Sequence, residues 1–209
     1  MRHLADAWLT LARRAGARDD VAGTGSALLG RWSEPHRAYH DLAHLDEVLR
    51  RIDLLAVEAD HPDLVRLAAW FHDAVYDPGA TDNEERSAEV ATVALAALGL
   101  APGVVDEVAR LVRLTATHAV GPADRDGAVL CDADLAVLAA DPLRYQSYVE
   151  GVRREYAHLD DPAFARGRAD VLHRLLDRPQ LFMTAYGRRE WEQLARTNVS
   201  AETRSLRSD

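Results

Sequence analysis

Apolar residues recur every three or four positions along almost the whole chain, and this spacing constrains the fold more than any other feature. The pattern is clearest in two segments, at Leu4, Trp8, Leu11 and Ala15 and at Leu45, Val48, Leu49 and Ile52. On an α-helix, residues with this spacing share one face that can be buried. The sequence shows no sustained alternation of β-branched residues, which would indicate strands. It therefore predicts an all-α fold.

Glycine, proline and aspartate mark where the predicted helices begin and end. Asp141-Pro142 and Asp161-Pro162 each have the pattern of an N-cap followed by proline, and Asp82 followed by Glu85 has the spacing of a capping box. Gly23-Thr24-Gly25-Ser26 and a polar loop from 121 to 127 are expected to interrupt the helices. We predict helices over residues 1–16, 40–56, 62–73, 83–98, 102–118, from 142, from 162 and over 184–198.

Length and charge limit the kind of protein and the partners it can bind. The chain has 209 residues, 48% of them hydrophobic, which is enough for one domain with a proper core, and it contains no internal repeat or long linker. Its net charge is -9 and every basic residue is arginine, so neither a nucleic acid polymer nor an anionic membrane is an expected partner. A homo-oligomer is compatible with the sequence.

Cysteine content and hydropathy point to a soluble cytoplasmic protein. Cys131 is the only cysteine, so no intramolecular disulfide can form, and we expect it to be a small buried hydrophobic residue. No apolar run approaches the roughly 20 residues that a bilayer-spanning helix needs, and the first residues lack the apolar region of a signal peptide.

A histidine and an aspartate follow directly on an apolar run. The segment from Leu67 to Phe71 is apolar, and His72 and Asp73 come next, near the end of a predicted helix. Burying an imidazole and a carboxylate costs free energy unless both groups are compensated. A metal ion would compensate both, but further ligands must then come from elsewhere in the chain.

Candidate partners for this doublet lie upstream and downstream. His40 and His44 are four residues apart, so on a helix both would project from one face, although nine histidines can produce such a spacing by chance. Asp132 and Asp134 lie in an apolar segment; Asp132 could instead be the N-cap of a helix that begins at the next residue. Together these residues would form a mixed nitrogen and oxygen site, which suits Mn²⁺, Fe²⁺, Co²⁺, Ni²⁺ or Zn²⁺.

The order of these residues resembles the HD superfamily of metal-dependent phosphohydrolases. That family carries a His, a His-Asp doublet and a distant Asp on successive helices, and the matching residues here are His44, His72-Asp73 and Asp134. The chain looks most similar to bacterial HD proteins of about this length, and the similarity extends through Arg37-x-Tyr39-His40, residues 70–88, 152–156, Gly167-Arg168 and 195–198. The resemblance implies a single HD-type helical bundle over residues 1–209, with a core at about 36–140 and terminal helices packed on it.

A more distant similarity to cyclic nucleotide phosphodiesterases implies roles for further residues. Their Tyr-His-Asn-x-x-His motif is matched from Tyr39 to His44, with Asp41 in place of Asn. By that resemblance His44 is a metal ligand and His40 gives a proton to the leaving oxygen. Four arginines are implied to bind the phosphorylated substrate, namely Arg37, Arg153, Arg168 and Arg196.

The number of histidines favours one metal ion. Many two-metal HD proteins have two extra histidines between the doublet and the last Asp, whereas only His118 lies there in this chain. We therefore expect one divalent transition metal ion or Mg²⁺, with His118 as the candidate ligand of a weak second ion. Glu84 could orient the attacking water or touch that second ion, or it could only be a favourable charge in the first turn of a helix.

The resulting hypothesis is a phosphohydrolase that acts on a small phosphate ester or phosphoanhydride, including nucleotides. A metal-activated water would attack phosphorus and His40 would protonate the leaving group. Two alternatives remain open, an HD-type di-iron oxygenase and a sensor that binds metal or ligand without catalysis. The remaining histidines are interpreted as surface or structural residues, namely His3, His36, His61, His158 and His173.

Overall fold

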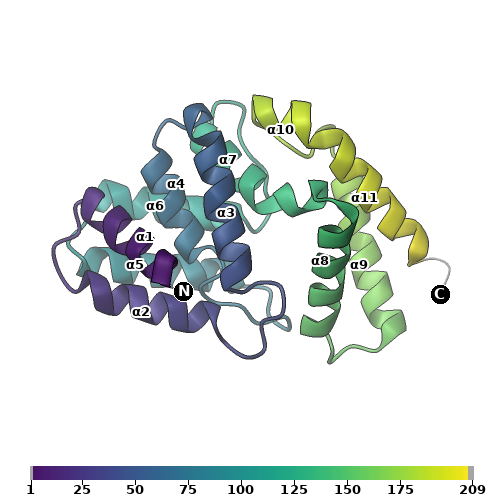
Figure 1. The fold of residues 1–209 in the computed structure, drawn as a ribbon, viewed down its shortest axis with the longest axis horizontal. Coiled ribbons are helices and arrows are strands. Elements are labelled where there is room, and N and C mark those ends of the chain that lie inside the picture. Colours follow the sequence, from purple (N-terminus) through teal and green to yellow (C-terminus); the bar gives the residue numbers. More distant parts are fainter. Residues whose placement is uncertain (1, 207–209) are drawn as a thin grey trace.

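The computed structural model describes residues 2–206, and all regular secondary structure in that range is helical, which confirms the all-α prediction (Figure 1). No strand occurs among these residues. The helices are α1 Arg2–Arg14, α2 Val21–Trp32, α3 Leu42–Leu55, α4 Pro62–Phe71, α5 Asn83–Ala97, α6 Pro102–Leu114, α7 Arg125–Leu135, α8 Pro142–Glu155, α9 Asp161–Leu176, α10 Ala185–Glu190 and α11 Glu192–Ser205. Two short 3-10 helices, η1 Ala56–Glu58 and η2 Ala136–Ala139, follow α3 and α7.

Helix α4 is at the centre of the core. It packs against α1, α3, α5, α6 and α7. The five residues from Leu67 to Phe71 are completely buried, as expected for a helical segment that is apolar on every side. Trp70 and Phe71 both meet the ring of Trp8 edge to face. The end of this helix, where the His-Asp doublet lies, is therefore held rigidly.

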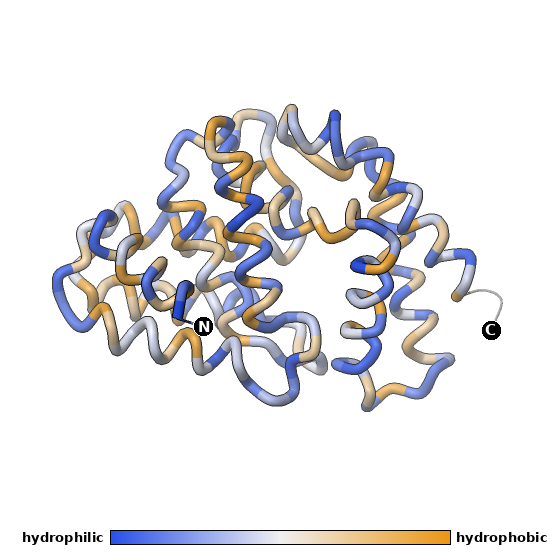
Figure 2. The backbone as a smooth tube through the Cα atoms, in the orientation of Figure 1, coloured by the Kyte–Doolittle hydropathy of each residue, from blue (hydrophilic) through white to orange (hydrophobic). Residues whose placement is uncertain are grey.

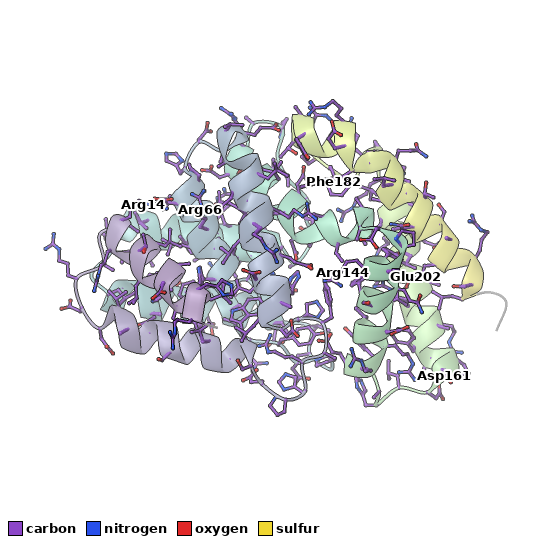
Figure 3. All side chains as sticks on the ribbon, in the orientation of Figure 1. Arg14, Arg66, Arg144, Asp161, Phe182 and Glu202 are labelled. Atoms are coloured by element: carbon purple, nitrogen blue, oxygen red, sulfur yellow. The ribbon has the colours of Figure 1, made fainter. Side chains whose placement is uncertain are left out.

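Helices α8 to α11 form the other side of the molecule, at the green and yellow end of the chain in Figure 1. Helix α11 packs on η2 and α9, and the segment around η2 that joins the two sides is hydrophobic (Figure 2). Arg144 of α8 reaches α3, where it pairs with Glu47 at 2.7 Å and lies over the ring of Tyr39 (Figure 3). Within the described range, no helix is both long and apolar enough to cross a bilayer.

The predicted break at residues 23–26 is wrong, because helix α2 runs through both glycines. Asp20 caps this helix by accepting the backbone N–H of Gly23. A Cβ at Gly25 would lie 2.3 Å from the Trp8 ring, so the glycine permits α1 and α2 to approach closely. Gly25 therefore serves the packing of two helices and is not part of a turn.

Several helix boundaries also differ from the prediction. Asp82 makes no side-chain capping bond, and Glu85 instead pairs with Arg113, so the capping box does not form. Helix α7 begins inside the predicted polar loop, and Asp160 rather than Asp161 caps α9. The predicted helix over 184–198 is two helices that are separated at Trp191.

Candidate metal centre

The His-Asp doublet lies where α4 ends. The backbone N–H of His72 still bonds to Ala68, and the chain then turns away from the helix. The His72 Nδ1 donates to the carbonyl of Ala69 at 2.8 Å, so its Nε2 presents a lone pair on the other side of the ring. A helix end is the place from which two adjacent side chains can reach one centre.

His44 comes from the first turn of α3 and faces His72. Asp41 is the N-cap of this helix and accepts the backbone N–H groups of Ala43 and His44, which fixes the start of the turn. The two Nε2 atoms of His44 and His72 lie 3.3 Å apart. Both imidazoles are buried.

Two carboxylates complete the cluster. Asp134, from the last turn of α7, places Oδ1 3.2 Å from His44 Nε2 and 3.5 Å from His72 Nε2. The ligand atoms of His44, His72 and Asp134 all lie within 4.8 Å of one another and could hold a metal ion. Asp73 Oδ2 lies 3.2 Å from His72 Nε2 and 3.8 Å from His44 Nε2. The structure thus brings all four predicted ligands together.

The chemistry of these donors fits a divalent cation. Ligand atoms that bind one ion at about 2.1 Å lie roughly 3.0 to 3.5 Å apart, which is close to the separations seen here. Without a cation, burial lowers the pKa of His72 but Asp73 and Asp134 outweigh it and raise that pKa well above its usual value. A positive charge between the imidazoles and the carboxylates is therefore strongly stabilised, and a metal ion can supply it.

His118 holds the second oxygen of Asp134. Its Nε2 lies 2.9 Å from Asp134 Oδ2, while Oδ1 faces the two buried imidazoles. His118 has φ 50°, in the left-handed region that costs a non-glycine residue about 1 to 2 kcal/mol. The contact with His118 orients the Asp134 carboxylate. Because His118 lies next to the metal cluster, it stays the candidate ligand of a second ion.

His40 does not lie on the same helical face as His44, because α3 begins only after it. Glu155 of α8 holds it instead: one carboxylate oxygen accepts the backbone N–H groups of Ala38, Tyr39 and His40, and the other lies 2.7 Å from His40 Nδ1. Burial opposes the charge of Glu155, but the hydrogen bond and charge of His40 lower the pKa of Glu155 to about 2.

Tyr76 completes the support of His40. Its ring stacks on the imidazole with a centroid distance of 4.2 Å, and its hydroxyl donates to Glu155 at 2.9 Å. Burial lowers the pKa of His40, yet the Glu155 hydrogen bond and the nearby carboxylates raise it overall. Because Nδ1 is occupied, Nε2 is the nitrogen that remains for chemistry.

A cavity of about 650 Å³ opens onto the metal cluster. Asp73, Asp134, His40 and His118 all line it, and so does Glu84 from the first turn of α5. This volume lies in the range of small-molecule sites. Both interpretations of Glu84, a water-orienting group and a favourable helix charge, are compatible with its position.

The four predicted substrate arginines differ in position. Arg168 lines the cavity but pairs with Glu202 at 2.7 Å and donates to the Tyr148 hydroxyl. The other three do not line it, since their guanidinium groups bind backbone carbonyls and nearby carboxylates. Arg37 bonds to the carbonyls of His40 and Asp73, and thereby ties the loop before α3 to the doublet; Arg153 and Arg196 bind carbonyls at the ends of α8 and α9.

Asp132 has a structural role. It is completely buried inside α7, so the N-cap interpretation is wrong. Its carboxylate accepts the backbone N–H groups of Met183 and Thr184 and the Thr184 hydroxyl. It is not part of the His44, His72 and Asp134 group.

Comparisons with protein-family models, with curated proteins and with solved structures gave no match. The site is therefore interpreted from its own geometry and from the sequence.

Proposed function

We propose that this protein is a metal-dependent hydrolase of a small phosphate ester or phosphoanhydride. The observation that carries the proposal is that a His, His, Asp cluster able to hold a metal ion reaches one small-molecule cavity through Asp134, and that a separately supported imidazole, His40, lines the same cavity. The proposal includes membership of the HD superfamily, whose motif order matches His44, His72-Asp73 and Asp134.

The reaction needs a nucleophile and a proton donor on opposite sides of phosphorus. A divalent ion at the cluster would polarise a phosphoryl oxygen and lower the pKa of its water. The water oxygen forms a bond to phosphorus while the bond from phosphorus to the leaving oxygen breaks. Asp73 and Asp134 lie at the cavity wall, where they would hold the ion and could accept a hydrogen bond from the attacking water.

His40 is proposed to give its Nε2 proton to the leaving oxygen. Glu155 fixes the ring through Nδ1 and stabilises the protonated imidazole, and the raised pKa keeps more of His40 protonated near neutral pH. Tyr76 keeps the ring in place by stacking. Glu155 and Tyr76 are thus positioning residues.

The test is a screen of phosphate esters and nucleotides with protein loaded with Mn²⁺, Co²⁺, Ni²⁺ or Mg²⁺, beside Asp73→Ala. We expect the variant to lose metal and turnover while it keeps its helical circular dichroism. Asp170→Asn, an exposed aspartate on α9, is the matched control. Turnover that survives in Asp73→Ala overturns the assignment, and so does a lack of hydrolysis with every metal, which would favour a sensor. Two irons per chain with oxygen consumption would favour the oxygenase.

The variant His40→Ala distinguishes a role of His40 as proton donor from a role as metal ligand. We expect it to keep its metal and to lose turnover by about 100-fold or more, most strongly with poor leaving groups, because general acid catalysis contributes about 10² to 10⁴. Metal content measured on the purified variant decides the alternative. If the metal is lost as completely as in Asp73→Ala, His40 is itself a ligand.

A further inference from the structure

Two arginines on the α9 side of the cavity lack carboxylate partners. Arg174 and Arg178 both line the cavity, and neither forms an ion pair with any residue of the range 2–206. Arg178 donates only to the carbonyl of Thr117, at 2.6 Å. In contrast, Arg168 on the same wall is neutralised by Glu202.

The position of these two arginines distinguishes them from others. The net charge of the chain is -9, and arginines such as Arg66 and Arg113 are paired with carboxylates. Arg13 and Arg166 also form no ion pair within residues 2–206, but neither lines the cavity. Guanidinium groups in a concave site attract an anion and bind its oxygens through charge-assisted hydrogen bonds. Basic residues at a helix C-terminus also stabilise the helix dipole, but this role does not require that they line a cavity.

Two hydrogen bonds to adjacent residues connect Arg178 with the metal cluster. Arg178 bonds to Thr117, and the next residue, His118, bonds to Asp134. Leu135, Val171 and Leu175 line the same cavity and provide an apolar surface. A ligand in this cavity would thus meet a cation site, an apolar surface and a second positive site.

We propose that the substrate carries a second anionic group, a phosphate or a carboxylate, which Arg174 and Arg178 bind while its reacting phosphate lies at the metal cluster. The apolar part of the substrate packs on Val171 and Leu175. This proposal rests on the proposed hydrolase function and narrows its substrate class to organic phosphates with two separated negative groups.

The test compares three substrates with Mn²⁺-loaded protein: 4-carboxyphenyl phosphate, its methyl ester and 1,4-phenylene bisphosphate. In the double variant Arg174→Gln/Arg178→Gln we expect kcat/KM to fall at least about tenfold further for the two substrates with a second anionic group than for the methyl ester, because the variant loses charge-assisted hydrogen bonds to that group. The loss should appear chiefly in KM. Comparison of the carboxylate with the bisphosphate shows which anion the pair prefers. The matched control is Arg166→Gln, an exposed arginine of α9 outside the cavity lining.

A binding measurement separates this proposal from the hydrolase function. Calorimetry with 4-carboxyphenylphosphonate, which is not hydrolysed, should show binding to the Mn²⁺-loaded protein that weakens at least about tenfold in the double variant. If the three esters are hydrolysed and the double variant affects all of them equally, the second anion site is wrong and the hydrolase function stands. If nothing is hydrolysed but the phosphonate binds through the arginines, the anion site stands without the hydrolase function.

Discussion

Glu155 is the residue on which the geometry around His40 depends. One of its oxygens accepts hydrogen bonds from three successive backbone N–H groups before α3. The other accepts hydrogen bonds from the His40 imidazole and from the Tyr76 hydroxyl. Its side chain has no exposure to solvent. A carboxylate buried with this many donors organises a loop that has no regular secondary structure of its own.

We predict that Glu155→Gln lowers both stability and turnover. The amide can still accept the backbone N–H groups, but its NH₂ group faces the donors of His40 and Tyr76. The loss should be about 1 to 3 kcal/mol at pH 7, because buried donors are left unpaired. Urea unfolding followed by circular dichroism measures it.

The pH dependence of this loss has a definite sign. The folded pKa of Glu155 is lowered from 4.5 to about 2, so its stabilising effect is present above pH 4.5 and disappears as the pH falls towards 2. The difference in unfolding free energy between wild type and Glu155→Gln should therefore shrink over this interval. A difference that stays constant from pH 7 to pH 3 would contradict the role assigned to this carboxylate.

At the scale of elements, the contact between α1 and α2 rests on a single glycine. Gly25 is buried against the Trp8 ring, whereas a Cβ at Gly30 in the same helix would have no neighbour within 4 Å. We predict that Gly25→Ala destabilises the fold by about 1 to 3 kcal/mol through overpacking. Gly30→Ala should be neutral or stabilise by up to about 1 kcal/mol. Thermal unfolding of the two variants compares them directly, and equal shifts would refute the packing argument.

The same elements explain what the sequence can and cannot predict. Helix periodicity and the prolines that begin α4 and α8 predict those helices, because these signals are local. Gly23 and Gly25 are misleading in the sequence. Gly25 is explained by contact with Trp8 from another helix, and Gly23 by its closeness to the capping side chain of Asp20. The clustering of His44, His72, Asp73 and Asp134 could be predicted because the order of these residues along the chain resembles a family motif. The role of Glu155 could not be predicted, because this residue binds a loop that lies 115 residues away in the sequence.

At the scale of the molecule, Asp132 connects the helices α1 to α7 with the side formed by α8 to α11. From within α7 it holds the backbone at Met183 and Thr184, just before α10. We predict that Asp132→Ala destabilises the protein by roughly 2 to 4 kcal/mol, because it leaves buried N–H groups without acceptors. Metal affinity should change little in the protein that remains folded. A tenfold loss of metal affinity would instead place Asp132 in the metal site.

The cavity and its groups come from both sides of the molecule. Asp73, just after α4, and Asp134 of α7 line it on one side, whereas Val152 of α8 and Arg174 of α9 line it on the other. The proposed metal reaches substrate only if these sides stay together. The metal site is thus the claim on which both proposals depend.

Calorimetric titration of metal-free protein with Mn²⁺ measures this site without any substrate. We expect about one equivalent to bind to the wild type and to Asp170→Asn, and the affinity to fall at least about tenfold in Asp134→Asn and in His72→Gln. Equal Mn²⁺ binding by all four proteins would contradict the account.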